Sequence, residues 1–305
     1  MPSSKEMLQA IRQHLQQNNQ TAGKTAVQIR LEMAESAKQL PLLHEVSAER
    51  VDVDGVSGEW LNVTGDHSEK GNGKVILYVH GGGFISGNCE IYRDLAARIA
   101  AASGVRVFTL EYRLAPEYVY PAANEDCLAA YSWLLRTGFL PEDIILGGDS
   151  VGASLVLMTL ITLRDAGDKL PAAAFLLSPH SDLVHLDGES YDSRAEMDPT
   201  GSREGNQRIL RDYLGGYNGI MPALLSPLRL RLDGLPPLLI QAGDQEVLLS
   251  DAERLAERVR AYGGEATLEI WENLWSVFQL MSALLPEGQE AIGKIGSFVK
   301  RIWSM

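Results

Sequence analysis

The most informative stretch of this sequence is Asp143-Ile144-Ile145-Leu146-Gly147-Gly148-Asp149-Ser150-Val151-Gly152. It begins as a short apolar run, ends in the pattern Gly-x-Ser-x-Gly, and is followed by an apolar stretch of helical length. A strand, a sharp turn with a serine and a helix in this order are typical of a nucleophile elbow. Glycines beside the serine let strand and helix approach closely, and the helix directs its positive end at the hydroxyl. We therefore predict that Ser150 is a nucleophile at the C-terminal edge of a sheet; the alternative is a tight turn whose serine has no chemical role.

A second glycine-rich segment supports this interpretation. Residues 77–79 form another short apolar run, which leads into His80-Gly81-Gly82-Gly83. Glycine N–H groups that no side chain shields can stabilise a negatively charged oxygen. A phosphate-binding loop is not favoured, because the pattern Gly-x-Gly-x-x-Gly would need a glycine in place of Ser86. We expect His80 to brace this loop by hydrogen bonding rather than to act as a base.

Short β-rich runs alternate with helical patterns along most of the chain. Eight strands are predicted, at residues 46–53, 59–63, 75–79, 105–110, 144–146, 172–177, 238–241 and 266–271. Helical patterns separate the later strands, at residues 91–102, 122–135, 152–165, 250–262 and 289–303. This βαβ rhythm predicts an α/β protein with a mostly parallel sheet that helices cover on both faces. The first two strands have no helix between them and should pair antiparallel at an edge.

The chain is expected to divide into four segments. Residues 1–45 carry two amphipathic helical patterns and would form part of a cap. Residues 46–185 and 231–305 would form the two parts of the catalytic core. Residues 186–230 are too many for a plain loop and contain a helical pattern near residues 203–214, so we interpret them as a cap insertion that packs beside the first helices.

Composition limits the classes of partner and site. The chain has 305 residues, of which 45% are hydrophobic, and needs neither a metal nor a disulfide to build a core. Its net charge of −13 repels phosphate backbones and anionic lipids, so neither nucleic acid nor a membrane is an expected partner. Cys89 and Cys127 are too few and too far apart for a metal site, and we expect both to be buried apolar residues. No signal-peptide pattern and no run of eighteen apolar residues occurs, which favours a cytoplasmic protein. We expect neither a cofactor nor a metal.

Seven motifs in sequence order give the chain a family resemblance. They are His80-Gly81-Gly82-Gly83, Tyr112-Arg113-Leu114-Ala115-Pro116-Glu117, Tyr120-Pro121-Ala122-Ala123, Gly148-Asp149-Ser150-Val151-Gly152, Leu177-Ser178-Pro179, Asp198-Pro199 and Ser226-Pro227. With them the chain resembles the bacterial hormone-sensitive-lipase-like carboxylesterases, which have the α/β-hydrolase fold. The resemblance implies a helical cap and hydrolysis of small short-chain acyl esters, and it leaves a homodimer open. It also implies that the N–H groups of Gly82, Gly83 and Val151 bind the oxyanion, with Gly81 and Asp149 supporting the loop.

The acidic member of a catalytic triad should follow the seventh predicted strand. The carboxylates there are Asp244, Glu246 and Asp251. In the family that the chain resembles, the acid stands two residues before a leucine, and Glu246 stands two residues before Leu248. We therefore predict Glu246 as the acid, although the family more often has aspartate. Asp251 is expected to begin a helix, where its charge offsets the dipole, and Asp244 to close the turn.

The general base is missing from its expected position. The resemblance implies a catalytic histidine after the eighth strand, and Ser276 occupies that position, thirty residues after Glu246. All six histidines precede residue 186. Imidazole titrates near pH ~6.5, whereas an aliphatic hydroxyl is a negligible base at neutral pH. We therefore expect severely impaired turnover; His180, His185 or a bound water are the alternative bases.

Two accounts explain an intact framework without its base. One is a deliberate replacement of histidine by serine, made to stop turnover or to remodel the site. The other is a natural pseudoenzyme that kept the pocket as a small-molecule receptor, as the related plant gibberellin receptors did by losing the same histidine. We favour the first, because natural decay would also have changed Ser150, Glu246 and the glycine loop. An interaction or structural protein is not favoured, since the sequence has no repeat and no charge run.

Overall fold

An eight-stranded sheet with the order β1-β2-β4-β3-β5-β6-β7-β8 organises the structure, a computed structural model that describes residues 3–18, 23–38, 43, 46–53, 55–63 and 73–304. Its strands are β1 Val46–Val53, β2 Val56–Val63, β3 Val75–Val79, β4 Val107–Glu111, β5 Ile144–Asp149, β6 Ala173–Leu177, β7 Leu238–Gly243 and β8 Ala266–Trp271. Strand β2 pairs antiparallel with β1 and β4, and the other neighbours are parallel. The predicted eight-stranded, mostly parallel sheet with an antiparallel edge is confirmed. The expected segment boundary at residue 45 lies outside the described residues.

Strand β5 is longer than its sequence pattern indicates. The apolar run predicts a strand over residues 144–146, yet Gly147 and Gly148 continue the pairing with β3 on one side and β6 on the other. Glycine has a low intrinsic strand propensity, so the pairing partners decide the conformation here. A Cβ on Gly147 would lie 2.1 Å from the ring of Phe175, so the absence of a side chain is required by packing. The strand therefore runs up to the residue before Ser150.

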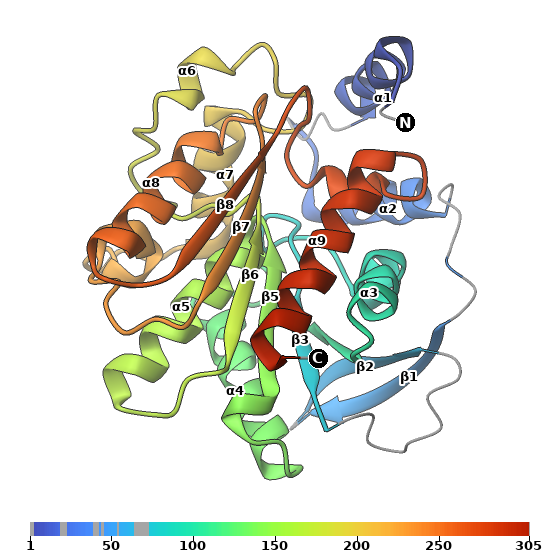
Figure 1. Ribbon diagram of the computed structural model, residues 1–305. Helices are drawn as coiled ribbons and strands as arrows, with labels where there is room; N and C mark the ends of the chain where they lie inside the picture. Colours follow the sequence, from blue (N-terminus) through green and yellow to red (C-terminus); the bar gives the residue numbers. More distant parts are fainter. Residues whose placement is uncertain are drawn as a thin grey trace.

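Helices cover both faces of the sheet (Figure 1). The α-helices are α1 Lys5–Asn18, α2 Ala26–Ala37, α3 Cys89–Ser103, α4 Ala122–Arg136, α5 Val151–Ala166, α6 Ser190–Ser193, α7 Arg203–Leu214, α8 Leu249–Ala261 and α9 Pro286–Trp303. Short 3-10 turns lie at Pro141–Asp143, Ala223–Leu225, Pro227–Arg229 and Phe278–Met281. Helices α4, α5 and α8 contribute to one large buried cluster, and α3 and α9 contribute to a second cluster on the opposite face. Both clusters include side chains of the sheet, which is therefore the central layer.

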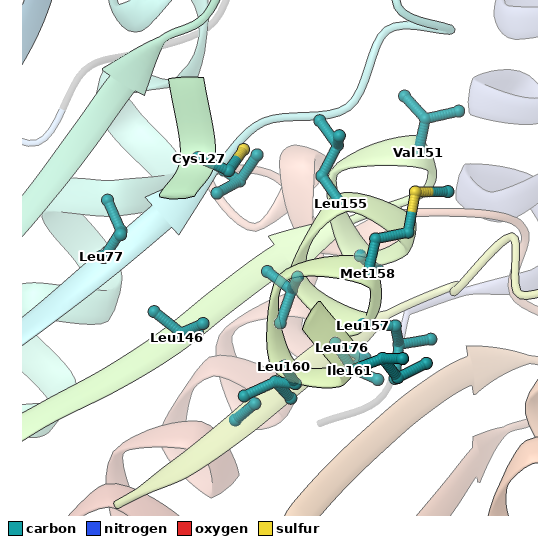
Figure 2. Close-up of a cluster of buried hydrophobic side chains, with 14 of the residues drawn as sticks. Leu77, Cys127, Leu146, Val151, Leu155, Leu157, Met158, Leu160, Ile161 and Leu176 are labelled. Atoms are coloured by element: carbon teal, nitrogen blue, oxygen red, sulfur yellow. The ribbon is translucent and has the colours of Figure 1, made fainter. Parts of the chain in front are cut away.

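Helix α5, which follows the turn at Ser150, is packed inside the core. Figure 2 shows Leu155 and Met158 of this helix in one apolar cluster with Leu146 of β5 and Cys127 of α4. The helix is mostly buried, because the sheet lies under one side of it and α4 packs against another. Since the strand before Ser150 and the helix after it are both packed, the turn between them has little freedom to relax.

Helix α1 lies over the segments that follow β7 and β8. Leu15 of α1 packs in a small buried cluster with Leu274 and Trp275. Arg12 donates a hydrogen bond to the carbonyl of Met197 at 2.9 Å and another to the side chain of Gln245. The first helix is thus attached to both loops in which the acid and the base of the triad were predicted.

Helix α2 is attached to the glycine-rich loop. The Nε of Arg30 donates to the carbonyl of Ile85 at 2.6 Å, and its Nη2 donates to the carbonyl of Ala115 at 2.8 Å. The same guanidinium pairs with both carboxylate oxygens of Glu117, at 2.9 and 2.7 Å. A planar guanidinium that satisfies two carbonyls and one carboxylate fixes the helix in one orientation on this loop.

The composition also bears on the two cysteines, on membrane-spanning helices and on clusters of metal ligands. Cys89 and Cys127 are both buried and unbridged, as predicted. No helix in the described part of the chain has the length and apolarity that crossing a membrane would require. Among the same residues, no three His, Cys, Asp or Glu side chains gather as metal ligands would.

Replacing Gly152 by alanine should destabilise the fold. A Cβ there would lie 2.2 Å from the carbonyl oxygen of Val79 and 2.5 Å from that of His80, and a backbone carbonyl cannot move aside cheaply. We expect the free energy of unfolding to fall by about 1–3 kcal/mol. Gly293→Ala is the matched control, because Gly293 is an exposed helical position with nothing within 4 Å, and alanine should stabilise it by about 0.5–1 kcal/mol. Urea unfolding measures both, and equal effects would contradict the packing argument.

Candidate active site

Ser150 occupies a strained turn between β5 and α5. Its φ of 51° and ψ of −121° lie outside the regions that a serine ordinarily adopts. Its peptide N–H donates to the carbonyl of Leu177 at 2.9 Å, which ties the turn to the end of β6. The hydroxyl is partly exposed and makes no hydrogen bond within the described part of the chain. The turn thus presents a free hydroxyl at the start of α5, where the helix dipole is positive.

The glycine-rich loop after β3 lies against this turn. Gly82 and Gly83 have φ values of 104° and 65°, a region that favours glycine. A Cβ on Gly82 would lie 2.3 Å from the carbonyl oxygen of Ser86, so the loop closes too tightly for a side chain. Among the described residues, nothing accepts a hydrogen bond from the N–H of Gly82 or Gly83. Val151 is the first residue of α5, where a helix leaves its N–H without an internal partner.

Asp149 joins the end of β5 to the glycine loop. Its Oδ1 accepts hydrogen bonds from the hydroxyl of Tyr78 at 2.8 Å and the N–H of Gly81 at 2.9 Å, and its Oδ2 accepts one from Tyr92 at 3.2 Å. Burial raises the pKa of Asp149 to about 7, against the opposing effect of these three hydrogen bonds. Asp149, the residue before Ser150, therefore anchors the first glycine of the loop.

The ring of His80 lies beneath the same loop. It stacks on Tyr112 with ring centroids 4.3 Å apart, and its Nδ1 donates to the carbonyl of Gly81 at 2.7 Å. Burial lowers the pKa of His80 to about 4, so the ring is neutral at neutral pH. Every one of these contacts is with the loop or its supports, which fits a brace rather than a base.

Glu246 follows β7 and is fully buried. Its Oε2 accepts hydrogen bonds from the N–H of Gly243 at 3.0 Å and from the hydroxyl of Ser178 at 2.8 Å. Its Oε1 is buried without a hydrogen-bond partner in the described chain. Burial raises the pKa of Glu246 to about 8, and the two hydrogen bonds oppose that rise only in part. One oxygen of the carboxyl group is thus fixed by two hydrogen bonds, and the other has no hydrogen-bond partner in the described chain.

Ser178 connects Glu246 to the segment that carries Ser276. Its hydroxyl donates to Glu246 and accepts a hydrogen bond from the N–H of Val277 at 2.9 Å. Ser276 therefore directly precedes Val277, whose N–H is linked through the Ser178 hydroxyl to Glu246, the predicted acid. The Ser276 side chain is partly exposed and makes no hydrogen bond within the described residues. Sequence reasoning used Ser178 only as part of a family motif, and no sequence signal indicates this bridging role.

The other carboxylates after β7, Asp244 and Asp251, each also have a buried Oδ1 without a partner in the described chain, but they differ from Glu246 in their other contacts. Asp251 lies in the first turn of α8, as expected, and its Oδ2 accepts hydrogen bonds from the N–H groups of Ser181 and Asp182 at 3.1 and 3.2 Å. Asp244 is partly exposed at the turn, where its N–H donates to the carbonyl of Trp271. No hydrogen bond joins either carboxylate to Ser178 in the described chain.

Neither alternative histidine forms a hydrogen bond with Ser150 Oγ or with Glu246 in the described chain. The ring of His180 is fully buried, and its Nε2 lies 3.2 Å from the hydroxyl of Tyr191. Burial lowers its pKa to about 4. His185 is bound instead to Asp182, with Nδ1 to Oδ1 at 2.9 Å. Both rings therefore belong to hydrogen-bond networks that include neither Ser150 Oγ nor Glu246.

A cavity of about 1140 Å³ lies between helix α2, helix α7 and the glycine-rich loop. Gly82 and Gly83 form part of its wall, and Ile29 and Ile209 face it from the two helices. Arg208 of α7 also lines the cavity and donates to the carbonyl of Lys24 at 2.6 Å, which connects α7 to the start of α2. Ser150 is not part of the wall, so a ligand in this cavity would approach the site from the glycine-loop side. Composition and spacing gave no signal for a space of this size.

Replacing Glu246 by glutamine should make stability less dependent on pH. The folded-state pKa of about 8 lies above the ordinary value of 4.5, so the native protein loses stability as pH rises from 4.5 through 8, where only the unfolded chain ionises readily. Glutamine does not ionise. The free energy of unfolding of the variant should therefore rise relative to that of the unchanged protein by on the order of 1 kcal/mol per pH unit in that interval. Urea unfolding at pH 5, 7 and 9 measures the difference. Glu196→Gln, at an exposed position, should show no such trend, and a difference at Glu246 that stays constant with pH would contradict the assignment.

Comparison with known proteins places this geometry in a family. A family model for the alpha/beta hydrolase fold matches residues 76–280. An esterase from the bacterial hormone-sensitive lipase family has a similar solved structure, with 40% sequence identity and a TM-score of 0.91 over 98% of this chain and 99% of that chain. An acetyl-hydrolase from Streptomyces hygroscopicus is 38% identical over 250 residues, which are 82% of this chain and 81% of that protein. An esterase from Acinetobacter venetianus is 33% identical over 246 residues, covering 80% and 78% of the two chains. The chain therefore belongs to the alpha/beta hydrolase family and is an ester hydrolase scaffold similar to the hormone-sensitive-lipase-like esterases.

Proposed function

We propose that the chain is a carboxylic ester hydrolase scaffold for short-chain acyl esters, and that its turnover is strongly impaired because Ser276 replaces the general base. The observation that carries this proposal is the carboxyl group of Glu246. It is fully buried, one of its oxygens accepts two hydrogen bonds, and the other has no partner in the described chain. Asp251 shares this pattern, but only Glu246 of the two is linked through Ser178 to the N–H of Val277, beside Ser276. In a serine hydrolase triad, that second oxygen would accept the N–H of the general base.

The rest of the arrangement suits acyl transfer. The Ser150 hydroxyl would attack the ester carbonyl, and the electron pair of the carbonyl would move onto its oxygen. The N–H groups of Gly82, Gly83 and Val151 are the donors that would bind this oxyanion, because no hydrogen bond in the described chain occupies them and Asp149 joins the loop to the turn of Ser150. The step that lacks a residue is removal of the Ser150 proton, and its later return to the leaving alkoxide.

The cost of that missing step is large. In a serine protease, loss of the catalytic histidine lowers turnover about a millionfold, which corresponds to about 8 kcal/mol of barrier. The oxyanion donors and substrate binding alone leave a residual acceleration of about 10³- to 10⁴-fold over water. The unchanged protein should therefore be a very slow esterase rather than an inert one.

Small esters are the favoured substrates. The similarity to an acetyl-hydrolase supports a short acyl group. The cavity beside the glycine loop is lined by the apolar side chains of Ile29, Ile85 and Ile209 and also by charged side chains of the two helices. A net charge of −13 disfavours adsorption to anionic lipid. These features support a small soluble ester over an emulsified lipid.

Replacing Ser276 by histidine should restore hydrolysis. An imidazole at this position would donate to the unpartnered Oε1 of Glu246 and take the proton of Ser150. We expect kcat for p-nitrophenyl acetate to rise by ~10³-fold or more, which steady-state kinetics would measure. Ser276→Ala is the control and should stay as slow as the unchanged protein. The double variant Ser150→Ala/Ser276→His should lose the gain, and a folded Ser276→His protein that stays inert would overturn the triad assignment.

A small-molecule receptor is the second candidate, favoured by the large cavity that remains beside a site without its base. In that case the unchanged chain should bind a ligand reversibly at one-to-one stoichiometry, and Arg208→Ala should weaken binding, because Arg208 lines the cavity and connects its two helices. Titration calorimetry against short-chain esters and their carboxylic acids measures this. Binding together with an inert, folded Ser276→His variant would favour the receptor, whereas restored hydrolysis would favour the esterase.

A further inference from the structure

The strained part of the glycine-rich loop extends one residue beyond its glycines. Phe84 has a φ of 62°, so three successive residues of the loop have positive φ. Glycine adopts such a conformation without a steric cost, whereas the Cβ of phenylalanine disfavours it. A strained residue of this kind persists only where the surrounding structure holds it. The orientation of the N–H groups of Gly82 and Gly83 therefore depends on what holds Phe84.

Helix α7 contacts this part of the loop with two side chains. The ring of Tyr213 stacks on the ring of Phe84, with centroids 3.8 Å apart and planes inclined by only 7°. Both of these side chains are fully buried. One turn earlier in α7, Ile209 lies against the same loop, since a Cβ on Gly83 would be 3.1 Å from its Cγ1. Residues four apart in a helix share one face, so one face of α7 packs against two neighbouring residues of the loop.

Tyr213 is itself fixed at its backbone and at its hydroxyl. Its carbonyl accepts a hydrogen bond from the N–H of Tyr120 at 2.8 Å. Its hydroxyl donates to Oδ1 of Asn124 in α4. The Nδ2 of Asn124 lies 2.9 Å from the sulfur of Met158 in α5, the helix that follows Ser150 (Figure 2). The ring of Tyr213 is therefore a fixed support for Phe84, connected to the helices on either side.

Backbone hydrogen bonds fix the loop in a different way. The carbonyl of Phe84 accepts the N–H of Ala115 at 2.9 Å, and the carbonyl of Gly82 accepts the N–H of Ser86 at 3.0 Å. These bonds hold carbonyl groups, and they leave the N–H groups of Gly82 and Gly83 without an acceptor in the described chain. The stack with Tyr213 adds a hold on the side chain of the residue whose backbone is strained.

We propose that Tyr213 is a positioning residue for the oxyanion donors, and that its stack on Phe84 keeps the N–H groups of Gly82 and Gly83 aimed at the developing oxyanion. This inference rests on the proposed function, which gives those N–H groups that role. No hydrogen bond joins Tyr213 to Ser150 in the described chain, so the effect is exerted through Phe84. It can be large, because a misplacement of about 1 Å can cost ~100-fold in rate.

The kinetic test uses the Ser276→His protein, in which the missing base is supplied. Adding Tyr213→Leu should lower kcat for p-nitrophenyl acetate by ~10- to 100-fold, because the oxyanion donors act mainly on the transition state. KM should stay within about twofold, since binding of the ground-state ester is little changed. Tyr213→Phe keeps the stacked ring and should keep kcat within about threefold. A fall in KM-independent turnover as large for Tyr213→Phe as for Tyr213→Leu would overturn the role of the stack.

Tyr131→Leu is the matched control for a loss of general stability. Tyr131 is also buried in the main cluster, and its hydroxyl donates to the carbonyl of Lys169 at 2.8 Å. In the described chain it has no ring contact with Phe84. Its replacement should leave kcat of the Ser276→His protein within about threefold. An equal fall in kcat for Tyr131→Leu and Tyr213→Leu would show a merely structural role and overturn the proposal.

Hydrogen exchange of the unchanged protein gives a readout that needs no activity. The N–H groups of Ser86 and Ala115 report on the loop, because they donate to the carbonyls of Gly82 and Phe84. Tyr213→Leu should accelerate their exchange by ~10-fold or more, since local opening of the loop becomes easier. Tyr213→Phe and Tyr131→Leu should change it by no more than about twofold. Exchange that is equally fast in Tyr213→Leu and Tyr131→Leu would contradict a specific hold on the loop.

Phe84→Leu removes the other ring of the stack and serves if circular dichroism shows that Tyr213→Leu is unfolded. It should lower kcat and accelerate exchange in the same way. Where both single variants fold, the double variant should be little slower than the slower single variant, because the two rings act as one unit. Losses in kcat that multiply in the double variant would overturn the coupling through Phe84.

The two levels of inference fail differently. If Ser276→His restores hydrolysis and adding Tyr213→Leu leaves kcat unchanged, the proposed function stands and the positioning role is wrong. A folded but inert Ser276→His protein would overturn the proposed function itself, whichever way the exchange rates come out. Lower kcat together with faster exchange of the loop, both restored by Tyr213→Phe, would support both.

Discussion

The structure depends on a contact in which two pieces of backbone meet without side chains between them. Gly152, at the start of α5, lies so close to the carbonyl oxygens of Val79 and His80 that a single methyl group would not fit. This contact brings the first turn of the helix against the end of β3, where the glycine-rich loop begins. The strained φ of Ser150 is maintained because the packed strand and helix on either side of it cannot relax independently. Ser150 and the glycine-rich loop are therefore placed by the same packing constraint.

Buried carboxyl groups form the second level of organisation. Asp149, Glu246 and Asp251 are all buried at the C-terminal edge of the sheet, and burial raises the pKa of each to about 7 or 8. The two aspartates receive hydrogen bonds from segments that they hold in place, so their desolvation is offset by structure. Glu246 and Asp251 are alike in that one carboxylate oxygen accepts two hydrogen bonds while the other is buried without a partner in the described chain. Glu246 differs in being linked through Ser178 to the N–H of Val277, beside Ser276.

The N-terminal helices connect these elements to the ligand space. Arg12 attaches α1 to the loop after β7, and Arg30 attaches α2 to the loop that continues the glycine segment. The cavity beside the glycine loop is then enclosed by α2 and α7, which are about 170 residues apart in the sequence and meet through Arg208 and Lys24. Replacing Arg12 or Arg30 should therefore disturb the loops around the site, although neither residue lies in a sequence motif that indicates chemistry.

Elements that depend on local chemistry could be predicted from the sequence alone. The alternation of apolar runs and helical patterns predicted the eight-stranded sheet, and glycine spacing located Ser150 and the loop at Gly82 and Gly83, because tight turns and close backbone contacts leave a compositional trace. The absence of a histidine near Ser276 is likewise evident from the amino-acid sequence alone. Only the tertiary structure decided that Gly147 and Gly148 belong to a strand, that Ser178 connects Glu246 to Val277, and that one oxygen of Glu246 has no donor. Those features arise from pairing and burial between segments far apart in the chain, and neither leaves a periodic pattern in the sequence.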